Sequence, residues 1–158
     1  MEQFALLAWL AALTTNIRLL TSVIVIPHRN PVFMAKALAT VDVLSGGRVT
    51  VGCGAGWMHE EFEALNLPPF EARGRVTNEY IEAMKVAWTE ANPAYQGEFV
   101  QFDHVDVQPQ PVQDPHPPVW IGGESMPAIR RAAALGDGWY PFGSNPKFRM
   151  DQIETYTT

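Results

Sequence analysis

The 158-residue sequence holds one cysteine, Cys53, and has fewer basic than acidic residues. A single cysteine excludes an internal disulfide framework and is typical of a reducing cytoplasm. With 11 Lys and Arg against 17 Asp and Glu, the formal net charge is -6, which argues against nucleic-acid binding through phosphate neutralisation. No apolar run reaches about 18 residues without a polar break, so we expect no membrane span. The first residues lack the basic region of a signal peptide, so we expect a cytoplasmic protein.

Hydrophobic residues make up 47% of the chain, which is enough to bury a core and excludes global disorder. The length predicts one domain over residues 1–158. Strand patterns cover residues 18–26, 48–53, 119–122 and 139–142. Helical patterns cover residues 2–14, 31–44, 57–65, 71–91 and 126–135, and Asn145 with Pro146 opens a last one. The first of these is apolar on most sides, so we expect it to be largely buried. The alternation predicts an α/β fold with a parallel sheet, interrupted by an irregular excursion over residues 92–118 that holds an exposed strand or hairpin.

A glycine-rich run, GCGAG, spans residues 52–56 between a predicted strand and a predicted helix. Such glycines let backbone amides approach an anion or a flat ring closely. A Rossmann fingerprint is not matched, because the third glycine comes one position early and no strand ending in an acidic residue follows. A tight turn without a ligand remains an equal alternative for this run alone.

A second glycine run, Gly122 and Gly123 followed by Glu124 and Ser125, again lies between a strand and a helix. It predicts either a phosphate site or an ordinary helix N-cap. Because the carboxyl ends of parallel strands meet at one edge of a sheet, both glycine turns are expected at the edge where α/β proteins bind ligands. Their coincidence favours a binding site over two unrelated turns.

The remaining candidates are weaker. His28 follows a predicted core strand and is a candidate for contact with substrate or cofactor, although a solvated loop histidine is the more common case. No His or Cys spacing is typical of zinc, so no metal site is expected. Cys53 is interpreted as a small buried residue. The five tryptophans are expected mostly in the core, with Trp57 also placed to line a pocket.

Four segments together resemble the luciferase-like monooxygenase family: residues 19–65, the RxRxxxE pattern of residues 73–79, PQPVQDPHPPVWIGG of residues 109–123, and RAAALGDGWYP of residues 131–141. The resemblance covers nearly all of residues 3–143. It implies a TIM barrel and a flavin- or deazaflavin (F420)-dependent oxidoreductase, with F420 or FMN as the cofactor and a small-molecule substrate.

The resemblance also implies site residues. Ser22 and Val23 match the strand that carries a non-prolyl cis peptide against the cofactor ring. Gly54, Ala55 and Gly56 match the turn beside the ring, and Gly122, Gly123 and Ser125 match the loop whose amides hold the cofactor phosphate. The family signature over residues 42–48 is interpreted as structural, and Leu20 departs from the glycine usual in the family.

A complete (β/α)8 barrel needs about 250 residues. We therefore expect a partial barrel of about four parallel strands, resembling the family's third to sixth. Its open edges and apolar inner face predict a homodimer, a higher oligomer or a complementing chain. The alternatives to an enzyme are a non-catalytic half-barrel that assembles with itself or with a partner, and a Rossmann-like binder, against which the glycine spacing argues.

Overall fold

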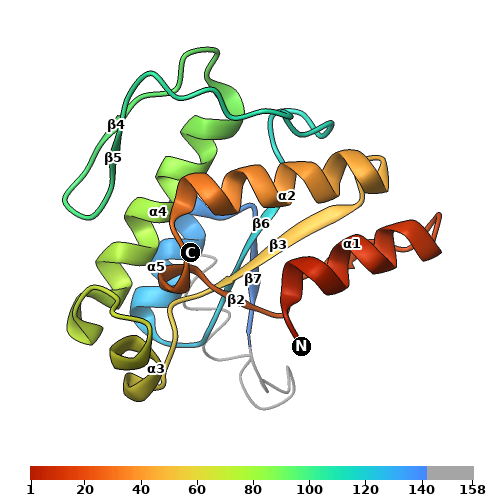
Figure 1. Cartoon of the computed structure of the whole chain (residues 1–158). Coiled ribbons are helices and arrows are strands. Elements are labelled where there is room, and N and C mark those ends of the chain that lie inside the picture. The colour runs from red at the N-terminus through yellow and green to blue at the C-terminus, as the bar shows by residue number, and fades with distance from the viewer. Residues whose placement is uncertain (142–158) are drawn as a thin grey trace.

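The computed structural model describes residues 1–141, which form a parallel sheet with helices packed along it (Figure 1). The helix expected from Asn145 and the end of the strand expected at Phe142 lie outside the described residues. In chain order the elements are α1 (Gln3–Leu13), β1 (Leu19–Leu20), β2 (Ile24–Val25), η1 (Ile26–His28), α2 (Pro31–Ser45), β3 (Val49–Gly54), α3 (His59–Ala64), η2 (Phe70–Ala72), α4 (Arg73–Thr89), β4 (Tyr95–Gln96), β5 (Gln101–Phe102), β6 (Val119–Gly122), α5 (Met126–Leu135) and β7 (Gly138–Tyr140).

The main sheet has the order β1-β3-β6-β7, and β2 also pairs with β3. Each of these pairs is parallel, as expected. The expected strand over residues 18–26 is divided into β1 and β2. Between β1 and β2, hydrogen bonds of the Thr21 side chain take the place of the backbone hydrogen bonds of a regular strand pair. The Thr21 hydroxyl accepts from Gly52 N–H at 2.8 Å and donates to the Gly52 carbonyl at 3.0 Å. A Cβ at Gly52 would lie 1.9 Å from the Thr21 carbonyl oxygen, so only glycine fits beneath this crossing.

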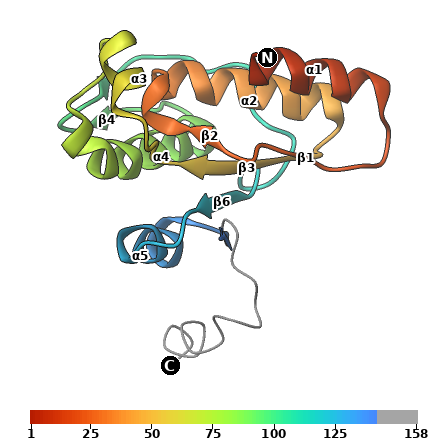
Figure 2. The same ribbon diagram turned by 90° about the horizontal axis from the view of Figure 1, so that it is seen from below.

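Helices cover the outer face of the sheet. Seen from below, α1, α2 and α4 lie along β3, while α5 lies beside β6 and β7 (Figure 2). Because side chains alternate along a strand, Val119 and Ile121 of β6 are buried in the helix-packed core, whereas Trp120 between them is 37% exposed on the opposite face. This curved arrangement is a partial (β/α)8 barrel, and Trp120 marks its inner face.

Two expectations about burial are wrong. Helix α1 buries only Leu7 and Ala11, while Trp9 and Leu13 are 60% and 62% exposed, because α1 packs by one side against α2 and β1. The tryptophans are not mostly in the core either: Trp88 is buried, but Trp9, Trp57 and Trp120 are exposed.

The signature over residues 42–48 makes structural contacts, as expected. Asp42 is fully buried, and its carboxylate accepts hydrogen bonds from backbone N–H groups of Val49, Val112 and Gln113 and from the Gln113 side chain. The Arg48 guanidinium donates to the carbonyls of Ala11, Thr14, Ile17 and Ser45 and to the Thr14 hydroxyl. The first network fixes the excursion to α2, and the second fixes the end of α1 to the start of β3.

The excursion over residues 92–118 contains the expected hairpin, formed by antiparallel β4 and β5. The chain from there to β6 has no regular structure. Of the helices in residues 1–141, none has the length and apolar composition needed to cross a membrane.

Candidate functional site

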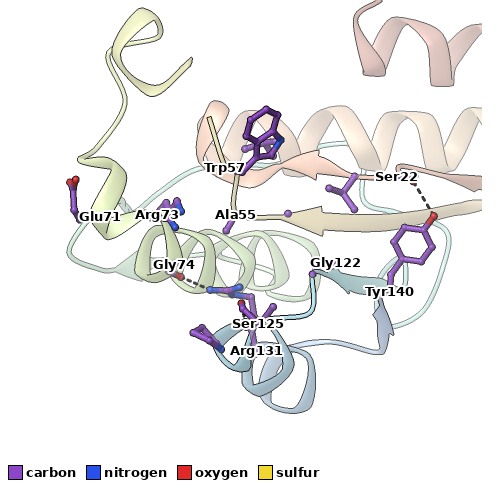
Figure 3. A pocket seen from close by; sticks show the side chains of 17 residues that line it. Ser22, Ala55, Trp57, Glu71, Arg73, Gly74, Gly122, Ser125, Arg131 and Tyr140 are labelled. Atoms are coloured by element: carbon purple, nitrogen blue, oxygen red, sulfur yellow. Dashed lines mark hydrogen bonds between the residues drawn. The ribbon is translucent and has the colours of Figure 1, made fainter. Parts of the chain in front are cut away.

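A cavity of about 750 Å³ opens at the carboxyl ends of β2, β3, β6 and β7 (Figure 3). It is lined by Ser22, Val23, Val25, Gly54, Ala55, Gly56, Trp57, Glu71, Arg73, Gly74, Gly122, Gly123, Ser125, Pro127, Ala128, Arg131 and Tyr140. All eight residues expected to bind the cofactor are among them. The two glycine turns, separated by more than 60 residues of chain, therefore form parts of one cavity wall.

Val23 explains why two of these positions are glycine. A Cβ at Gly54 would lie 2.6 Å from Val23 Cγ2, and a Cβ at Gly122 would lie 2.9 Å from Val23 Cγ1. The Val23 side chain therefore occupies the space that side chains on β3 and β6 would fill. The Ser22–Val23 peptide is cis, as the resemblance implied.

The end of the first glycine run turns the chain toward α3. Gly56 has φ +83°, and a Cβ there would lie 2.9 Å from the Phe62 ring and 3.0 Å from Val25. Both the left-handed backbone and the close packing require glycine at this position. Trp57 follows directly, is 80% exposed and lines the cavity, as the sequence suggested.

The second glycine run is held by bonds within the chain. Gly123 has φ +109°; its N–H donates to the Tyr140 carbonyl at 3.3 Å, and its carbonyl accepts from Trp139 Nε1 at 2.8 Å. The Ser125 hydroxyl accepts from Ala128 N–H at 3.4 Å and caps α5. The Gly123 N–H therefore has a partner within the chain, and the role of this loop in holding a phosphate stays a prediction.

Sequence reasoning missed the two arginines of the cavity wall. Arg131 on α5 is only 6% exposed, and it donates through Nε to Asn78 Oδ1 and through Nη2 to the Gly74 carbonyl at 2.9 Å. Burial lowers the pKa of its guanidinium from the usual value. Arg73 lies with its guanidinium carbon 3.9 Å from the centre of the Phe70 ring.

A signal for Arg131 is present in the sequence. Arg131 is three residues after Ala128 and four before Leu135, which places it on the apolar face of α5. Its neighbour Arg130, by contrast, is exposed. A charged residue on the buried face of a helix indicates either a partner or a ligand.

Tyr140 was also missed as a site residue. Its hydroxyl lies 3.1 Å from the Ser22 hydroxyl, so β7 and the β1–β2 junction meet at the cavity (Figure 3). Between them these two hydroxyls offer a hydrogen-bond donor and further acceptor positions to a ligand.

His28 does not line this cavity. It ends η1 and packs edge-on against the Phe62 ring. Its Nε2 lies 3.7 Å from a Glu61 carboxylate oxygen and has no hydrogen-bond partner among residues 1–141. Burial lowers the pKa of the His28 imidazole, and the nearby Glu61 opposes that shift. These contacts make His28 a packing partner of α3.

Among residues 1–141 no three His, Cys, Asp or Glu side chains are grouped as metal ligands would be. Cys53 is buried, and desolvation raises the pKa of its thiol to about 12. A thiol in this state is a poor nucleophile.

The chain matches the family model of luciferase-like monooxygenases over residues 1–158. It is 41% identical over 130 residues to the uncharacterized protein Rv0953c of Mycobacterium tuberculosis, covering 82% of this chain and 45% of that protein. It is 34% identical over 147 residues to the FMNH2-dependent dimethylsulfone monooxygenase of Pseudomonas putida, covering 92% of this chain and 40% of that enzyme. The chain thus spans about half the length of these curated relatives.

The chain is also similar in fold to solved structures. The monooxygenase RslO1 from Streptomyces bottropensis superposes with a TM-score of 0.87 at 27% identity, covering 98% of this chain and 47% of that one. The coenzyme F420-dependent tetrahydromethanopterin reductase from Methanopyrus kandleri superposes with a TM-score of 0.84 at 23% identity, covering 99% and 48%, which shows the shared fold. FMN and F420 enzymes thus both occur among the similar proteins. By its match over the whole sequence, the chain belongs to the luciferase-like monooxygenase family.

Proposed function

We propose that this chain is a flavin- or F420-dependent oxidoreductase, in whole or in part, with its cofactor in the cavity at the carboxyl ends of the strands. One observation carries the proposal: the β1–β2 junction and both glycine turns, all expected to bind the cofactor, line a single cavity. Ligands bind at this edge of the sheet in barrel enzymes.

The cavity suits a flat, largely apolar ring with a polar tail. Its volume, about 750 Å³, lies within the range of small-molecule sites, roughly 300–1,000 Å³. Val23, Val25, Ala55 and Pro127 supply apolar wall, and the absence of side chains at Gly54 and Gly122 lets Val23 pack over the ends of β3 and β6. The wall also carries polar side chains on Ser22, Glu71, Arg73, Ser125, Arg131 and Tyr140, and in cofactor sites such groups fix the orientation of the ligand.

When bound, the cofactor supplies the hydride or oxygen chemistry. The chain's own residues hold and orient it. In the proposal, Ser22, Val23, Gly54, Ala55 and Gly56 lie against the ring, while Gly122, Gly123 and Ser125 lie at its phosphate end. The apolar wall excludes water from the ring, and the Ser22 and Tyr140 hydroxyls hydrogen-bond its polar edge or a small-molecule substrate.

Support for the two cofactors comes from different relatives. The Pseudomonas putida relative is named as FMNH2-dependent, whereas two structural neighbours are named as F420-dependent and share the fold.

The buried, unpaired thiol of Cys53 supports the further proposal of a cytoplasmic location.

The test is a titration of the purified chain with FMN and with F420, followed by fluorescence. Saturable binding of one of them is expected. In Gly123→Val, the φ of +109° strains the new residue and its Cβ would lie 3.2 Å from Ala128 Cβ, so binding should be lost. Gly46→Asn, at a left-handed helix end with open space around it, is the control that should still bind. Unchanged affinity in a folded Gly123→Val protein would contradict the proposal.

A second candidate is a non-catalytic half-barrel that assembles with itself or with a partner chain. The exposed Trp120 on the inner face favours it, since a closed barrel would cover this side chain. Turnover separates the two candidates. Oxidation of the reduced cofactor above the rate without protein supports the enzyme, and tight binding without turnover supports the assembly.

A further inference from the structure

Trp57 is a large aromatic side chain that the fold leaves open at the cavity. It lines the cavity and is 80% exposed. Among residues 1–141 its indole N–H has no hydrogen-bond partner, and its ring packs against no other ring. A tryptophan side chain stabilises a fold mainly through the apolar area that it buries. The indole of Trp57 buries little of its area, so packing within this chain does not account for a tryptophan at this position.

The backbone on both sides of Trp57 is held in place. Gly56 has φ +83°, and a Cβ there would lie 2.9 Å from the Phe62 ring and 3.0 Å from Val25. Two residues after Trp57, His59 begins α3, whose Phe62 is buried. The turn therefore fixes the backbone position of Trp57, although no ring contact or hydrogen bond fixes the indole. An aromatic side chain on a preformed wall with an open face is typical of a small-molecule site.

A cluster of aromatic rings lies close by and does not include Trp57. The centre of the Phe62 ring lies 5.6 Å from that of His28 and 5.1 Å from that of Phe70, and the His59 ring lies 5.3 Å from Phe70. These rings pack edge-on against one another and hold α3 in place. Because the cluster is complete without the indole, Trp57 remains available to a ligand in the cavity.

Trp57 lies away from the part of the cavity where α5 begins. In Figure 3, Ala55 and Gly122 lie between Trp57 on one side and Ser125 on the other. The proposed function places the cofactor ring against Ala55 and its phosphate end at Ser125. A ligand group that stacks on Trp57 is therefore expected beside the ring, where a substrate reacts, and not at the phosphate end.

An open indole face selects a ligand by its shape. Flat aromatic rings approach such a face closely and gain an attraction beyond the area that they bury, whereas saturated rings of the same size do not. The indole N–H at the ring edge is also a donor for a polar atom of the ligand. Glu71 and Arg73, which line the same cavity, carry opposite charges, so their charges together favour neither anions nor cations.

We infer that Trp57 determines the substrate preference of this cavity, and that the substrate is a flat aromatic compound whose ring stacks on the indole. The inference rests on the proposed function, because the cofactor has to occupy the strand ends for a ligand on Trp57 to react with it. Trp57 is assigned to the substrate alone, so the affinity for the cofactor should not depend on this side chain.

The experiment compares two probes that share a hydroxyl and a fused two-ring skeleton, flat 2-naphthol and saturated decahydro-2-naphthol. Each is titrated by calorimetry into the chain saturated with FMN or F420, whichever binds. The measured quantity is the ratio of the two dissociation constants, because the probes also differ in apolar area. Trp57→Leu should shift this ratio against 2-naphthol by about two- to tenfold, the range for an aromatic pair beyond its buried area.

Matched variants locate the effect. Trp57→Leu should leave the affinities for the cofactor and for decahydro-2-naphthol within about twofold of the wild type, since the leucine retains apolar contact. Trp57→Phe should keep part of the preference because it keeps an aromatic face. Trp9→Leu removes an indole that is 60% exposed on α1 and does not line the cavity, and it should keep the full preference. Circular dichroism checks that each variant is folded.

A second readout is local to the indole. In a proton–nitrogen NMR spectrum, the indole N–H signal of Trp57 is the one that disappears in Trp57→Phe. In the wild-type chain 2-naphthol should shift this signal more than decahydro-2-naphthol does, because the current of an aromatic ring acts on nearby protons. This readout needs no activity and no Trp57→Leu protein.

The outcomes are distinct. An unchanged ratio in Trp57→Leu, or a Trp57 signal that 2-naphthol does not move, overturns the inference while the proposed function stands. Loss of cofactor affinity in Trp57→Leu also overturns it, since the indole would then hold the cofactor or the fold. Failure of both FMN and F420 to bind the wild-type chain contradicts the proposed function and the inference together.

Discussion

The hydroxyls of Ser22 and Tyr140 lie 3.1 Å apart although 118 residues separate them in sequence. Ser22 belongs to the junction between β1 and β2, and Tyr140 ends β7 at the other side of the sheet order. Both residues line the cavity, and β3 and β6 lie between their strands in the sheet order. Their hydrogen bond therefore connects the two sides of the cavity directly.

Removal of this bond should weaken the fold slightly and measurably. Tyr140→Phe and Ser22→Ala should each lower the free energy of unfolding by about 1 kcal/mol, the usual net value of such a bond. The double variant should cost less than the sum, because both changes remove the same interaction. Urea unfolding of the four proteins measures the coupling, and strictly additive effects would show that the hydroxyls do not interact in solution.

Removal of the buried Asp42 carboxylate should lower the free energy of unfolding more than removal of the Ser22 or Tyr140 hydroxyl. Asp42→Ala leaves the N–H groups of Val112 and Gln113 without their acceptor in a partly buried position. We expect the free energy of unfolding to fall by about 3 kcal/mol, since unsatisfied buried donors add to the lost bonds. The exposed Asp106→Ala is the control and should change stability by less than about 0.5 kcal/mol. Equal stabilities of the two variants would contradict this role of Asp42.

The local parts of the fold could be predicted from the sequence. Asn30 and Ser125 cap α2 and α5, and Gly46 ends α2 in a left-handed conformation, because each of these signals acts within a few residues. The division of the strand over residues 18–26 could not be predicted. It depends on Thr21 meeting Gly52, a contact between segments whose hydrophobic pattern shows only continuous apolar character.

The position of the candidate site could be predicted from the parallel order of the strands. Two glycine turns after parallel strands had to meet at one edge of the sheet, and they line one cavity. Arg131 was missed because a charged residue in a helix is usually solvated, and only its position among Ala128 and Leu135 indicates burial. His28 lies outside the cavity because η1, which begins with Ile26 and Pro27, directs it toward Phe62.

The burial of His28 should make the free energy of unfolding depend on pH. Burial lowers the pKa of its imidazole below the usual value of about 6.5, so the unfolded chain binds the proton more readily than the folded one. The contribution of the neutral His28 imidazole to the free energy of unfolding is then fully present above about pH 6.5, and it is lost as the pH falls toward the folded-state pKa. Arg29 adds to the lowering of the pKa, and Glu61 opposes it.

Urea unfolding at several pH values from about 8 to about 5 checks this expectation. His28→Gln should flatten the decrease in unfolding free energy on the acid side. His104→Gln is the control, since the His104 side chain is 93% exposed, and its profile should follow the wild type. A His28→Gln profile parallel to the wild type would contradict the assignment.

The 158-residue polypeptide is expected to self-associate. Within residues 1–141, β1 and β7 each have a strand neighbour on one side only, and Trp120 is 37% exposed on the inner face between them. Unpaired strand edges and exposed apolar side chains favour association, and two copies with parallel strands would close a barrel. A complementing chain that covers the same face would have the same effect.

Light scattering after size exclusion measures the mass at micromolar concentration, and a dimer or larger particle is expected. Trp120→Gln removes apolar surface from the inner face and should shift the equilibrium toward monomer. Trp9→Gln, on the exposed side of α1, removes a comparable side chain away from the sheet and should leave the mass unchanged. A stable particle near the 17.6 kDa monomer mass for the wild-type chain would contradict self-association. Equal effects of the two tryptophan variants would instead show that the contact does not involve the inner face, because only Trp120 lies there.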